Sequence, residues 1–257
     1  MAMLSESQVI DVFKALADPN RLALFRLLLE SDLANSELMD KTGLRQNLLS
    51  HHLNILVESE LVRVQRSIGD ARRHYFSVNL EQAGQFAAWW ERHGSCALDR
   101  RPVLPALSHS RRVLFLCRRN SARSLMAEAL ARHIAPDALI PFSAGIEEPE
   151  KMFPEVVRRV LAEHGISTAG LEAKTLAELA GQSFDLVITV CDTVHEGEGS
   201  GIPLLHGMRQ VHWSLTDPLE ATTSAEQDRL ARELLADLRL RLTCLVRRFA
   251  AEEAPEA

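Results

Sequence analysis

Apolar residues recur at helical spacing through the first sixty positions of the chain. Ser5 and Gln8 have the spacing of a capping box, and the apolar stripe that follows them lies at i, i+3, i+4, i+7 and i+8. Asp18 and Pro19 provide an N-cap and a proline at the first helical position, and Gly43 is suited to ending a helix. The pattern predicts four helices, at about 9–17, 19–30, 36–42 and 44–58.

The apolar period changes from the helical value to two after residue 60. Alternating apolar residues lie on both sides of Ile68-Gly69-Asp70, a turn signal, and predict a β-hairpin over residues 61–78. Arg66, Arg72 and Arg73 surround its tip. A short helix, a glycine turn, a longer helix and such a hairpin are the pattern of a winged helix-turn-helix. In that fold the longer helix enters the major groove of DNA, and the hairpin reaches phosphates or the minor groove.

A second pattern begins after residue 110. Helical spacing returns over residues 80–93, whereas 94–110 have no period and are typical of an interdomain linker. Short apolar runs then alternate with helical segments. Strands are predicted at 113–116, 139–142, 186–190 and 211–213, and helices at 125–133, 154–164, 176–180 and 225–249. This alternation predicts a four-stranded parallel sheet that is wrapped on both faces and binds ligands at the carboxyl ends of its strands.

The predicted fold class is therefore two domains, one mainly α and one α/β. A winged helix-turn-helix domain for DNA binding and dimerisation is expected over residues 1–93, an α/β domain over 111–250 and an acidic tail over 251–257. A chain of 257 residues is long enough for both. We see neither the pattern of a secretory signal nor an apolar run of about 18 residues, so we expect a cytoplasmic protein without a membrane partner.

Charge is spread unevenly along the chain. The formal net charge is −6, but residues 41–79 hold six Lys or Arg against three acids, a local +3 that leaves −9 on the rest. A basic island in an acidic protein is a modest indication of a nucleic-acid surface. On charge alone, an ordinary solvated face remains the alternative.

The chemistry centres on one of four cysteines, at positions 96, 117, 191 and 244, whose wide spacing does not indicate a disulfide framework. Cys117 follows a predicted strand, precedes a predicted helix and is separated from Arg123 by five residues. The predicted oxyanion-binding loop between them is Arg118, Arg119, Asn120, Ser121 and Ala122. A cradle of backbone N–H groups at a helix N-terminus stabilises a thiolate and binds phosphate or arsenate.

Three runs of the first domain form a set, namely ALADPNR at 15–21, SHHLNIL at 50–56 and GDARRHY at 69–75. Together they resemble the ArsR/SmtB family of small dimeric repressors. The resemblance implies a homodimer on double-stranded operator DNA. The residues that it places against the DNA are Gln46, Asn47, Ser50 and His51. For His52, a base contact and a packed position are both open. The helix before Gly43 lacks Cys and His, so no metal site of the common sensing kind is expected.

Residues 111–248 contain a second set of motifs. NSARSLMAE at 120–128 follows Cys117, FSAG lies at 142–145, VCD at 190–192 and HWSLTDP at 212–218. This set resembles the low-molecular-weight tyrosine phosphatase superfamily, and more closely its arsenate reductase branch. Leu125 and Leu219 favour that branch because the phosphatases usually have proline and an aromatic residue at these positions.

The residue types and the resemblance together indicate catalytic roles. A Cys117 thiolate attacks arsenic or phosphorus, Arg123 holds two oxygens, Ser124 hydrogen-bonds the sulfur, and Asp217 protonates the leaving oxygen. Arg118 and Arg119 either attract anions or are simply solvated. The resemblance also implies a monovalent-cation site lined by Asn120, Glu128 and Ser143; for Glu128, a plain helix-surface position is the alternative.

The resemblance makes Cys191 the resolving thiol, which forms a disulfide with Cys117 and releases arsenite. Residues 192–203 contain no further cysteine, and Cys244 is expected in the core of the last helix. No tightly bound cofactor is expected, and thioredoxin, glutaredoxin or a small thiol is the expected reductant. The leading hypothesis is an arsenic-resistance regulator fused to an arsenate reductase. The alternatives are a regulator whose Cys117 domain senses oxyanions or oxidation without turnover, and a tyrosine phosphatase tethered to a DNA-binding domain.

Overall fold

The computed structural model describes residues 4–93, 104, 107–149, 154–198 and 207–253. The chain divides into two compact units, residues 1–103 and 104–257. Cys96, most of the predicted linker, and the stretch that contains Ile202 and Pro203 lie outside the described residues.

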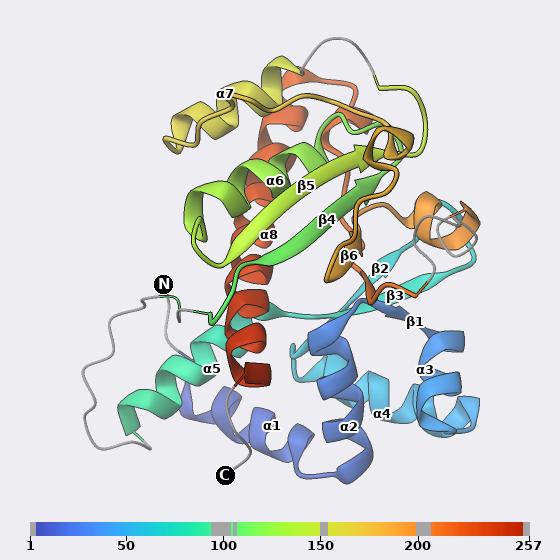
Figure 1. The fold of residues 1–257 in the computed structure, drawn as a ribbon. Helices are drawn as coiled ribbons and strands as arrows, with labels where there is room; N and C mark the ends of the chain where they lie inside the picture. The colour runs from blue at the N-terminus through green and yellow to red at the C-terminus, as the bar shows by residue number, and fades with distance from the viewer. Residues whose placement is uncertain (1–3, 94–103, 105–106, 150–153, 199–206, 254–257) are drawn as a thin grey trace. The chain divides into compact units, whose positions relative to one another are not determined.

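The first unit is mainly helical, with a small antiparallel sheet of order β1-β3-β2. Its helices are α1 (Glu6–Leu16), α2 (Pro19–Glu30), α3 (Asn35–Thr42), α4 (Gln46–Glu58) and α5 (Leu80–His93). Its strands are β1 (Leu33–Ala34), β2 (Val62–Arg66) and β3 (His74–Val78). Helix α3, the turn at Gly43, helix α4 and the β2–β3 hairpin confirm the predicted winged helix-turn-helix (Figure 1). Strand β1 was not predicted, because two residues are too few to show an alternating pattern.

Local capping explains where the first helices begin and end. The Ser5 N–H donates to Gln8 Oε1 at 2.9 Å, and the Gln8 N–H donates to Ser5 Oγ at 3.3 Å, which completes the predicted capping box. Asp18 Oδ1 accepts from the N–H groups of Asn20 and Arg21, and the Arg21 N–H is the main reason that the pKa of Asp18 is lowered. Gly43 has φ 69°, the left-handed conformation that ends α3.

Not every apolar residue of a predicted helix is buried in the core of the first unit. On α2, Leu24 and Leu28 are buried, but Leu22 is 45% exposed. Leu22 lies two residues before Leu24, and this spacing turns it about 200° around the helix, away from the buried face.

The second unit is built on a parallel sheet of order β5-β4-β6-β7, which confirms the predicted four-stranded sheet. Its strands are β4 (Arg111–Cys117), β5 (Leu139–Gly145), β6 (Leu186–Thr189) and β7 (Gln210–His212). Every residue from Val113 to Cys117 and from Leu186 to Thr189 is buried. Successive strand residues point to opposite faces, so these runs show that both faces of the sheet are covered.

The second unit also has three α-helices among the described residues, namely α6 (Arg123–Ile134), α7 (Glu155–Glu163) and α8 (Ser224–Glu253). Helix α6 packs on β4 and β5, and α8 packs on α6 and α7 (Figure 1). The helix predicted at 176–180 is only a 3₁₀ turn, Leu176–Leu179, and the π-helical turn at Val194–Glu198 was not predicted.

The predicted core position of Cys244 is also wrong, because this side chain is exposed. Leu240, one turn earlier on the same side of α8, is 41% exposed. The buried face of α8 at this point is formed by Leu238, Leu242 and Leu245. The apolar residues around Cys244 therefore lie on two faces of the helix, and only one of these faces packs into the core.

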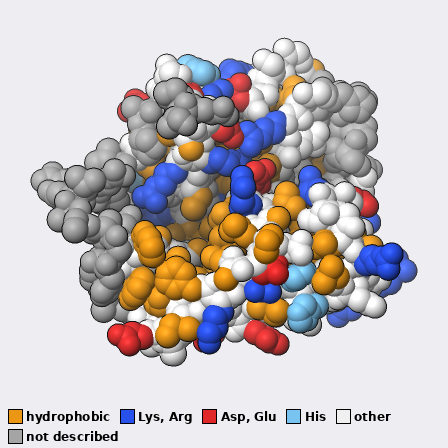
Figure 2. All heavy atoms as spheres, turned by 90° about the horizontal axis from the view of Figure 1, so that it is seen from below, with side chains coloured by type: hydrophobic (Ala, Val, Ile, Leu, Met, Phe, Trp, Pro, Cys, Tyr) orange, Lys and Arg blue, Asp and Glu red, His pale blue; other side chains and the backbone are white. Residues whose placement is uncertain are grey.

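Large hydrophobic side chains are also found at the surface of the first unit. Figure 2 shows hydrophobic side chains gathered on the face seen from below. Large hydrophobic side chains are exposed on α1 at Ile10 and Phe13 and on α5 at Trp90. The Phe13 ring contacts the rings of Phe86 and Trp90, at centroid distances of 5.2 and 5.9 Å. We call Phe13, Phe86, Trp89 and Trp90 the α1/α5 aromatic cluster. None of the described helices is both long and apolar enough to span a membrane.

Candidate functional site

The loop from Cys117 to Arg123 connects the end of β4 to the start of α6. Cys117 pairs in register with Gly145 at the end of β5. A Cβ atom on Gly145 would come within 2.9 Å of the loop backbone at Arg119 and Asn120, so only glycine lets the loop approach this closely. Asn120 has φ 50°, a left-handed conformation that asparagine tolerates better than most residues.

Two hydrogen bonds hold the sulfur of Cys117. The Asn120 N–H donates to it at 3.1 Å, and the Ser124 hydroxyl lies 2.9 Å away. The Asn120 side chain fixes this arrangement, because its amide nitrogen donates to Ser124 Oγ and its oxygen accepts from the Lys174 N–H. Cys117 is 3% exposed. The structure thus brings together Cys117, Asn120 and Ser124 at the start of the loop.

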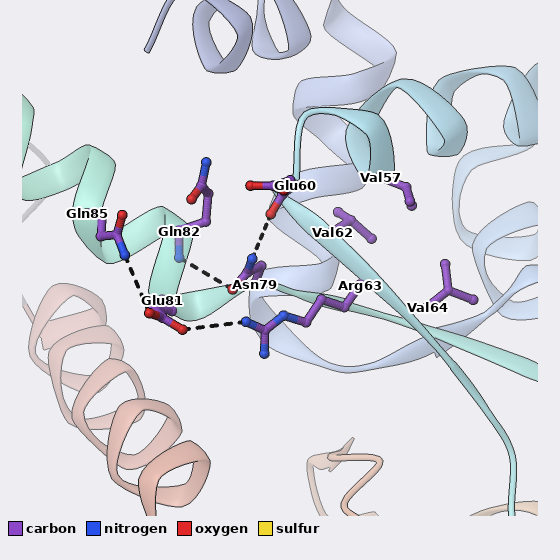
Figure 3. A pocket seen from close by; sticks show the side chains of 9 residues that line it. All are labelled: Val57, Glu60, Val62, Arg63, Val64, Asn79, Glu81, Gln82 and Gln85. Atoms are coloured by element: carbon purple, nitrogen blue, oxygen red, sulfur yellow. Dashed lines mark hydrogen bonds and ion pairs between the residues drawn. The ribbon is translucent and has the colours of Figure 1, made fainter. Parts of the chain in front are cut away.

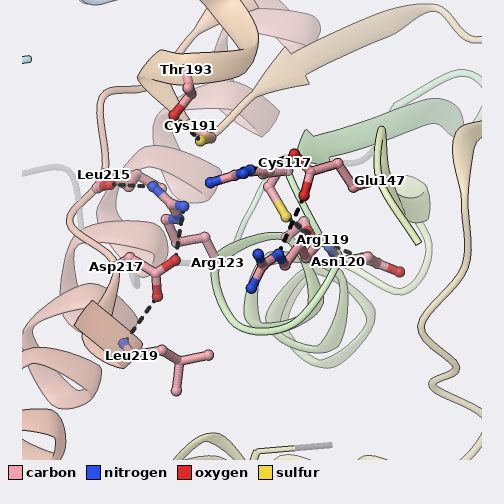
Figure 4. A network of polar contacts seen from close by, with 12 residues as sticks. Cys117, Arg119, Asn120, Arg123, Glu147, Cys191, Thr193, Leu215, Asp217 and Leu219 are labelled. Carbon is pink, nitrogen blue, oxygen red and sulfur yellow. Dashed lines mark hydrogen bonds and ion pairs between the residues drawn. The ribbon is translucent and has the colours of Figure 1, made fainter. Parts of the chain in front are cut away.

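Arg123 is 6% exposed and reaches across to the segment that follows β7. Its Nη2 pairs with Asp217 Oδ2 at 2.8 Å, and its Nη1 donates to the Leu215 carbonyl at 3.2 Å (Figure 4). Burial favours the neutral guanidine, but the charges of Cys191, Asp217 and Cys117 outweigh it and raise the pKa of Arg123. Among the described residues, the buried Nε of Arg123 has no hydrogen-bond partner. A buried donor without a protein acceptor is suited to an oxyanion.

Arg118 and Arg119 share one carboxylate. Their Nε atoms lie 2.6 and 3.3 Å from the two oxygens of Glu147, just beyond the end of β5. The hydrogen bond between Arg118 and Glu147 is the main reason that the pKa of Arg118 is raised and that of Glu147 is lowered. Both guanidinium groups are therefore engaged with an acid at the mouth of the loop.

A cleft of about 670 Å³ opens over the loop. The predicted residues that line it are Cys117, Arg118, Arg119, Ser121, Ala122, Arg123 and Asp217. Arg158 and Glu220 extend its rim with further charges of both signs. The volume greatly exceeds that of a tetrahedral oxyanion, so the cleft leaves room for a second group beside the loop.

Cys191 is buried and lies near the loop. Its charge contributes to the raised pKa values of both Arg123 and Arg118, and its sulfur is 3.4 Å from Thr193 Oγ1 (Figure 4). The next residue, Asp192, is buried with His212, whose Nε2 lies 3.2 Å from Asp192 Oδ1. This pair ties the segment after Cys191 to strand β7.

Glu128 is 1% exposed, which makes the surface position that we considered for it wrong. All residues of α6 from Arg123 to Ala131 are buried, so this helix has no solvent face in its first two turns. The Glu128 carboxylate accepts from the Ser143 hydroxyl and pairs with Arg132.

The DNA-binding candidates lie on α4 and the hairpin. Gln46, Asn47 and His51 are exposed, Ser50 is half-buried, and Arg66, Arg72 and Arg73 are exposed around the hairpin turn. His52 is 5% exposed and lies 3.7 Å from Asp18, which favours the packed position over a base contact. The hydrogen bond from Arg72 to Asp70 raises the pKa of Arg72 and lowers that of Asp70.

A second cleft, of about 620 Å³, lies in the first unit between β2 and the start of α5 (Figure 3). Its polar groups pair with one another. Arg63 lies 3.8 Å from Glu81, and the Asn79 amide donates to the Glu60 carbonyl at 2.9 Å. In the described part of the chain, no group of three or more His, Cys, Asp or Glu could hold a metal ion.

The sequence did not identify every residue of the site. Glu147 and Arg132 were not predicted, and Gly145 was noted only as part of a motif. Glu147 meets the loop only because β5 lies beside β4 in register, which the chain order does not reveal. Arg132 was recognisable in principle, because it lies four residues after Glu128 on a predicted helix.

Two family models match this chain. Residues 112–245 match the model described as "Low molecular weight phosphotyrosine protein phosphatase", and residues 18–64 match "Bacterial regulatory protein, arsR family". The two matches lie in the two units of the structure.

Curated relatives match the two units separately. An arsenate reductase of Halalkalibacterium halodurans is 32% identical over 117 residues, 45% of this chain and 79% of that protein. A glutaredoxin arsenate reductase of Synechocystis is 28% identical over 110 residues, 42% and 79% of the two chains. An arsenical resistance operon repressor of Staphylococcus xylosus is 31% identical over 78 residues, 30% and 72% of the two chains.

Proposed function

We propose that this chain, which belongs to the low molecular weight phosphotyrosine protein phosphatase family and carries an ArsR-family helix-turn-helix, regulates arsenic-resistance genes and reduces arsenate. One observation carries the reductase half of this proposal. Arg123 is buried at the end of the loop that begins at Cys117, and its Nη2 pairs with Asp217, whereas its Nε has no hydrogen-bond partner in the described part of the chain. The names of the relatives supply the choice of arsenate over phosphate.

In the first step, arsenate occupies the loop and the Cys117 thiolate attacks arsenic. A sulfur–arsenic bond forms, the bond from arsenic to a hydroxyl group of arsenate breaks, and this hydroxyl leaves as water after it takes a proton from Asp217. Arg123 holds the equatorial oxygens through its planar fork, and backbone N–H groups of residues 118–122 stabilise their charge. Leu219 N–H and Arg123 hold the Asp217 carboxylate at the cleft. In this proposal the bound arsenate takes the Arg123 guanidinium from Asp217, and the released carboxyl group then carries the proton for the leaving oxygen.

In the second step, the Cys191 thiolate attacks the Cys117 sulfur. A disulfide forms, and the electron pair of the sulfur–arsenic bond passes to arsenic, which leaves as arsenite. An external thiol then returns two electrons to the disulfide. Residues 192–203 offer no third cysteine to carry the disulfide outward, so we propose that a glutaredoxin, thioredoxin or small thiol attacks at the cleft itself.

The first unit binds operator DNA in this proposal. Gln46, Asn47, Ser50 and His51 read base edges from α4, and Arg66, Arg72 and Arg73 contact phosphates or the minor groove. We propose that two copies associate through the α1/α5 aromatic cluster. This dimer proposal rests on the apolar side chains of Phe13 and Trp90, which are 43% and 49% exposed.

A second candidate function is sensing without turnover. The absence of a cysteine from residues 192–203 favours it, because a Cys117–Cys191 disulfide that no reductant reaches would persist as a signal. The two functions separate in one assay set. Arsenite formation is measured with thioredoxin, glutaredoxin and small-thiol systems, beside hydrolysis of an aryl phosphate and binding of operator DNA. If the protein forms no arsenite but oxidant or arsenate changes its affinity for DNA, the sensing function is supported and the reductase function is not.

Glu147→Gln is expected to tighten oxyanion binding. The substitution removes a negative charge from the mouth of the loop and releases Arg118 and Arg119 toward the ligand. Because this is an exposed pair, we expect a gain of about two- to five-fold in phosphate affinity. Calorimetric titration of the full chain with phosphate measures it, with Glu226→Gln on α8 as the control. The gain shrinks as salt is raised, and weaker binding by Glu147→Gln would contradict the charge argument.

Two substitutions in the first unit are expected to affect DNA binding differently. Gln46→Ala weakens operator binding by about 1–3 kcal/mol and relaxes the sequence preference, because a base contact is lost. Arg73→Ala weakens operator and random DNA alike and lowers the salt slope by about 1, because a phosphate contact is lost. Fluorescence anisotropy at several salt concentrations measures both, with Arg247→Ala as a charge-matched control. Equal effects of the two substitutions would contradict the assigned contacts.

A further inference from the structure

Glu128 is a buried acid just behind the Cys117 loop. It lies on the second turn of α6, the helix that begins at Arg123, and is 1% exposed. A carboxylate in such a place is strongly unfavourable unless a positive charge and hydrogen bonds compensate it. The group that supplies the positive charge to Glu128 therefore determines whether helix α6, behind the loop, is held in place.

Both oxygens of Glu128 have partners within the chain. The Ser143 hydroxyl on β5 donates to Oε2 at 2.5 Å, and Arg132, one turn along α6, pairs with Oε1. The other terminal nitrogen of Arg132 donates to the Gly170 carbonyl at 3.4 Å, which orients the guanidinium. Ser143 pairs in register with Phe115, so this network joins α6 to the centre of the sheet.

The resemblance noted above implied that Asn120, Glu128 and Ser143 line a monovalent-cation site, and with Arg132 in place the residues do not fit one. The Asn120 oxygen accepts from the Lys174 N–H, and the Ser143 hydroxyl points its proton at Glu128. The remaining Glu128 oxygen is taken by a guanidinium, which would repel a second positive charge at contact distance.

We infer that Arg132 is a built-in substitute for such a cation. Its guanidinium neutralises Glu128, and the neutralised carboxylate anchors α6 to β5 behind the loop. Arg132 is therefore a positioning residue, and the chain needs no potassium ion to hold this part of the fold. The inference concerns the second unit alone and holds whatever reaction Cys117 performs.

The test is hydrogen–deuterium exchange of the full chain in potassium chloride and in choline chloride at equal ionic strength. Peptides from α6 and β5 report on the anchored region. We expect the wild-type protein to exchange equally in both salts. Arg132→Gln is expected to exchange several-fold faster in choline and to recover in potassium, because the ion then replaces the missing charge. Arg229→Gln, which removes a surface partner of Glu226 and Glu233 on α8, is the matched control and is expected to show no salt preference.

Two further variants keep the inference testable if Arg132→Gln fails to fold. Arg132→Lys retains the positive charge and is expected to behave as wild type. The double variant E128Q/R132Q has no buried charge to compensate, so its hydrogen exchange is expected to be equal in potassium and in choline. Potassium-dependent protection of the wild-type protein would overturn the inference, and so would an Arg132→Gln protein that potassium does not protect.

Discussion

Cys117→Ser is expected to lower the rate of arsenite formation by about 10⁴-fold or more, since the substitution removes the nucleophile itself. A serine hydroxyl at this position is not ionised near neutral pH and has no sulfur to form the disulfide. The fold should be retained, because the two atoms differ little in size and Asn120 and Ser124 can hydrogen-bond a hydroxyl equally well. Coupled assays of arsenite, together with circular dichroism, measure the two properties.

Cys244→Ser is the matched control for this prediction. Cys244 lies at the surface of α8, but desolvation by the residues around it raises the pKa of its thiol, so it holds less of the reactive thiolate. We expect this variant to keep wild-type activity. DNA binding by Cys117→Ser in the absence of oxyanion is also expected to be unchanged. Loss of folding in Cys117→Ser would show that the cysteine is structural, and retained arsenite formation would exclude it as the nucleophile.

Cys191→Ser is expected to stop turnover without stopping the first chemical step. Attack by a thiol held near the loop has the advantage of high effective concentration over attack by a dissolved thiol. Loss of Cys191 should therefore reduce steady-state arsenite formation by at least about 10²-fold. Cys117 still carries out its attack, so hydrolysis of an aryl phosphate should continue at the wild-type rate if the protein has this activity.

Mass spectrometry after reaction with arsenate provides a second measurement on Cys191→Ser. The wild-type protein is expected to lose the mass of two hydrogen atoms as the Cys117–Cys191 disulfide forms and its two electrons pass to arsenic. The Cys191→Ser protein should not form an intramolecular disulfide. If arsenite forms at the same rate with and without Cys191, the second step that we propose is wrong, and an external thiol resolves the adduct directly.

Much of the fold could be predicted because its signals are local. The capping box at Ser5, the N-cap at Asp18 and the glycine at position 43 mark helix ends in the sequence itself. The alternation of apolar runs and helices after residue 111 is sufficient to predict a parallel sheet. The Cys117 loop is local as well, since Asn120 and Ser124 lie within seven residues of the sulfur.

The errors arose where position depends on distant packing. Cys244 has apolar neighbours on both sides, and only the contacts of a 30-residue helix with α6 and α7 decide which of them are buried. Glu128 was compatible with a helix surface because nothing in the sequence shows that the first two turns of α6 are enclosed on every side. Glu147 is 28 and 29 residues from the arginines that it pairs with, and the register of β4 and β5 brings them together.

The central claim is that the Cys117 unit reduces arsenate. The most direct test incubates the purified full chain with arsenate and counts arsenite per chain by chromatography with elemental mass detection. Thioredoxin, glutaredoxin and small-thiol systems are supplied in separate reactions, with Cys117→Ser as the blank. Our account predicts repeated turnover, with more than one arsenite per wild-type chain, in at least one of the three systems. No arsenite in any of them, together with hydrolysis of an aryl phosphate by the same preparation, would contradict it.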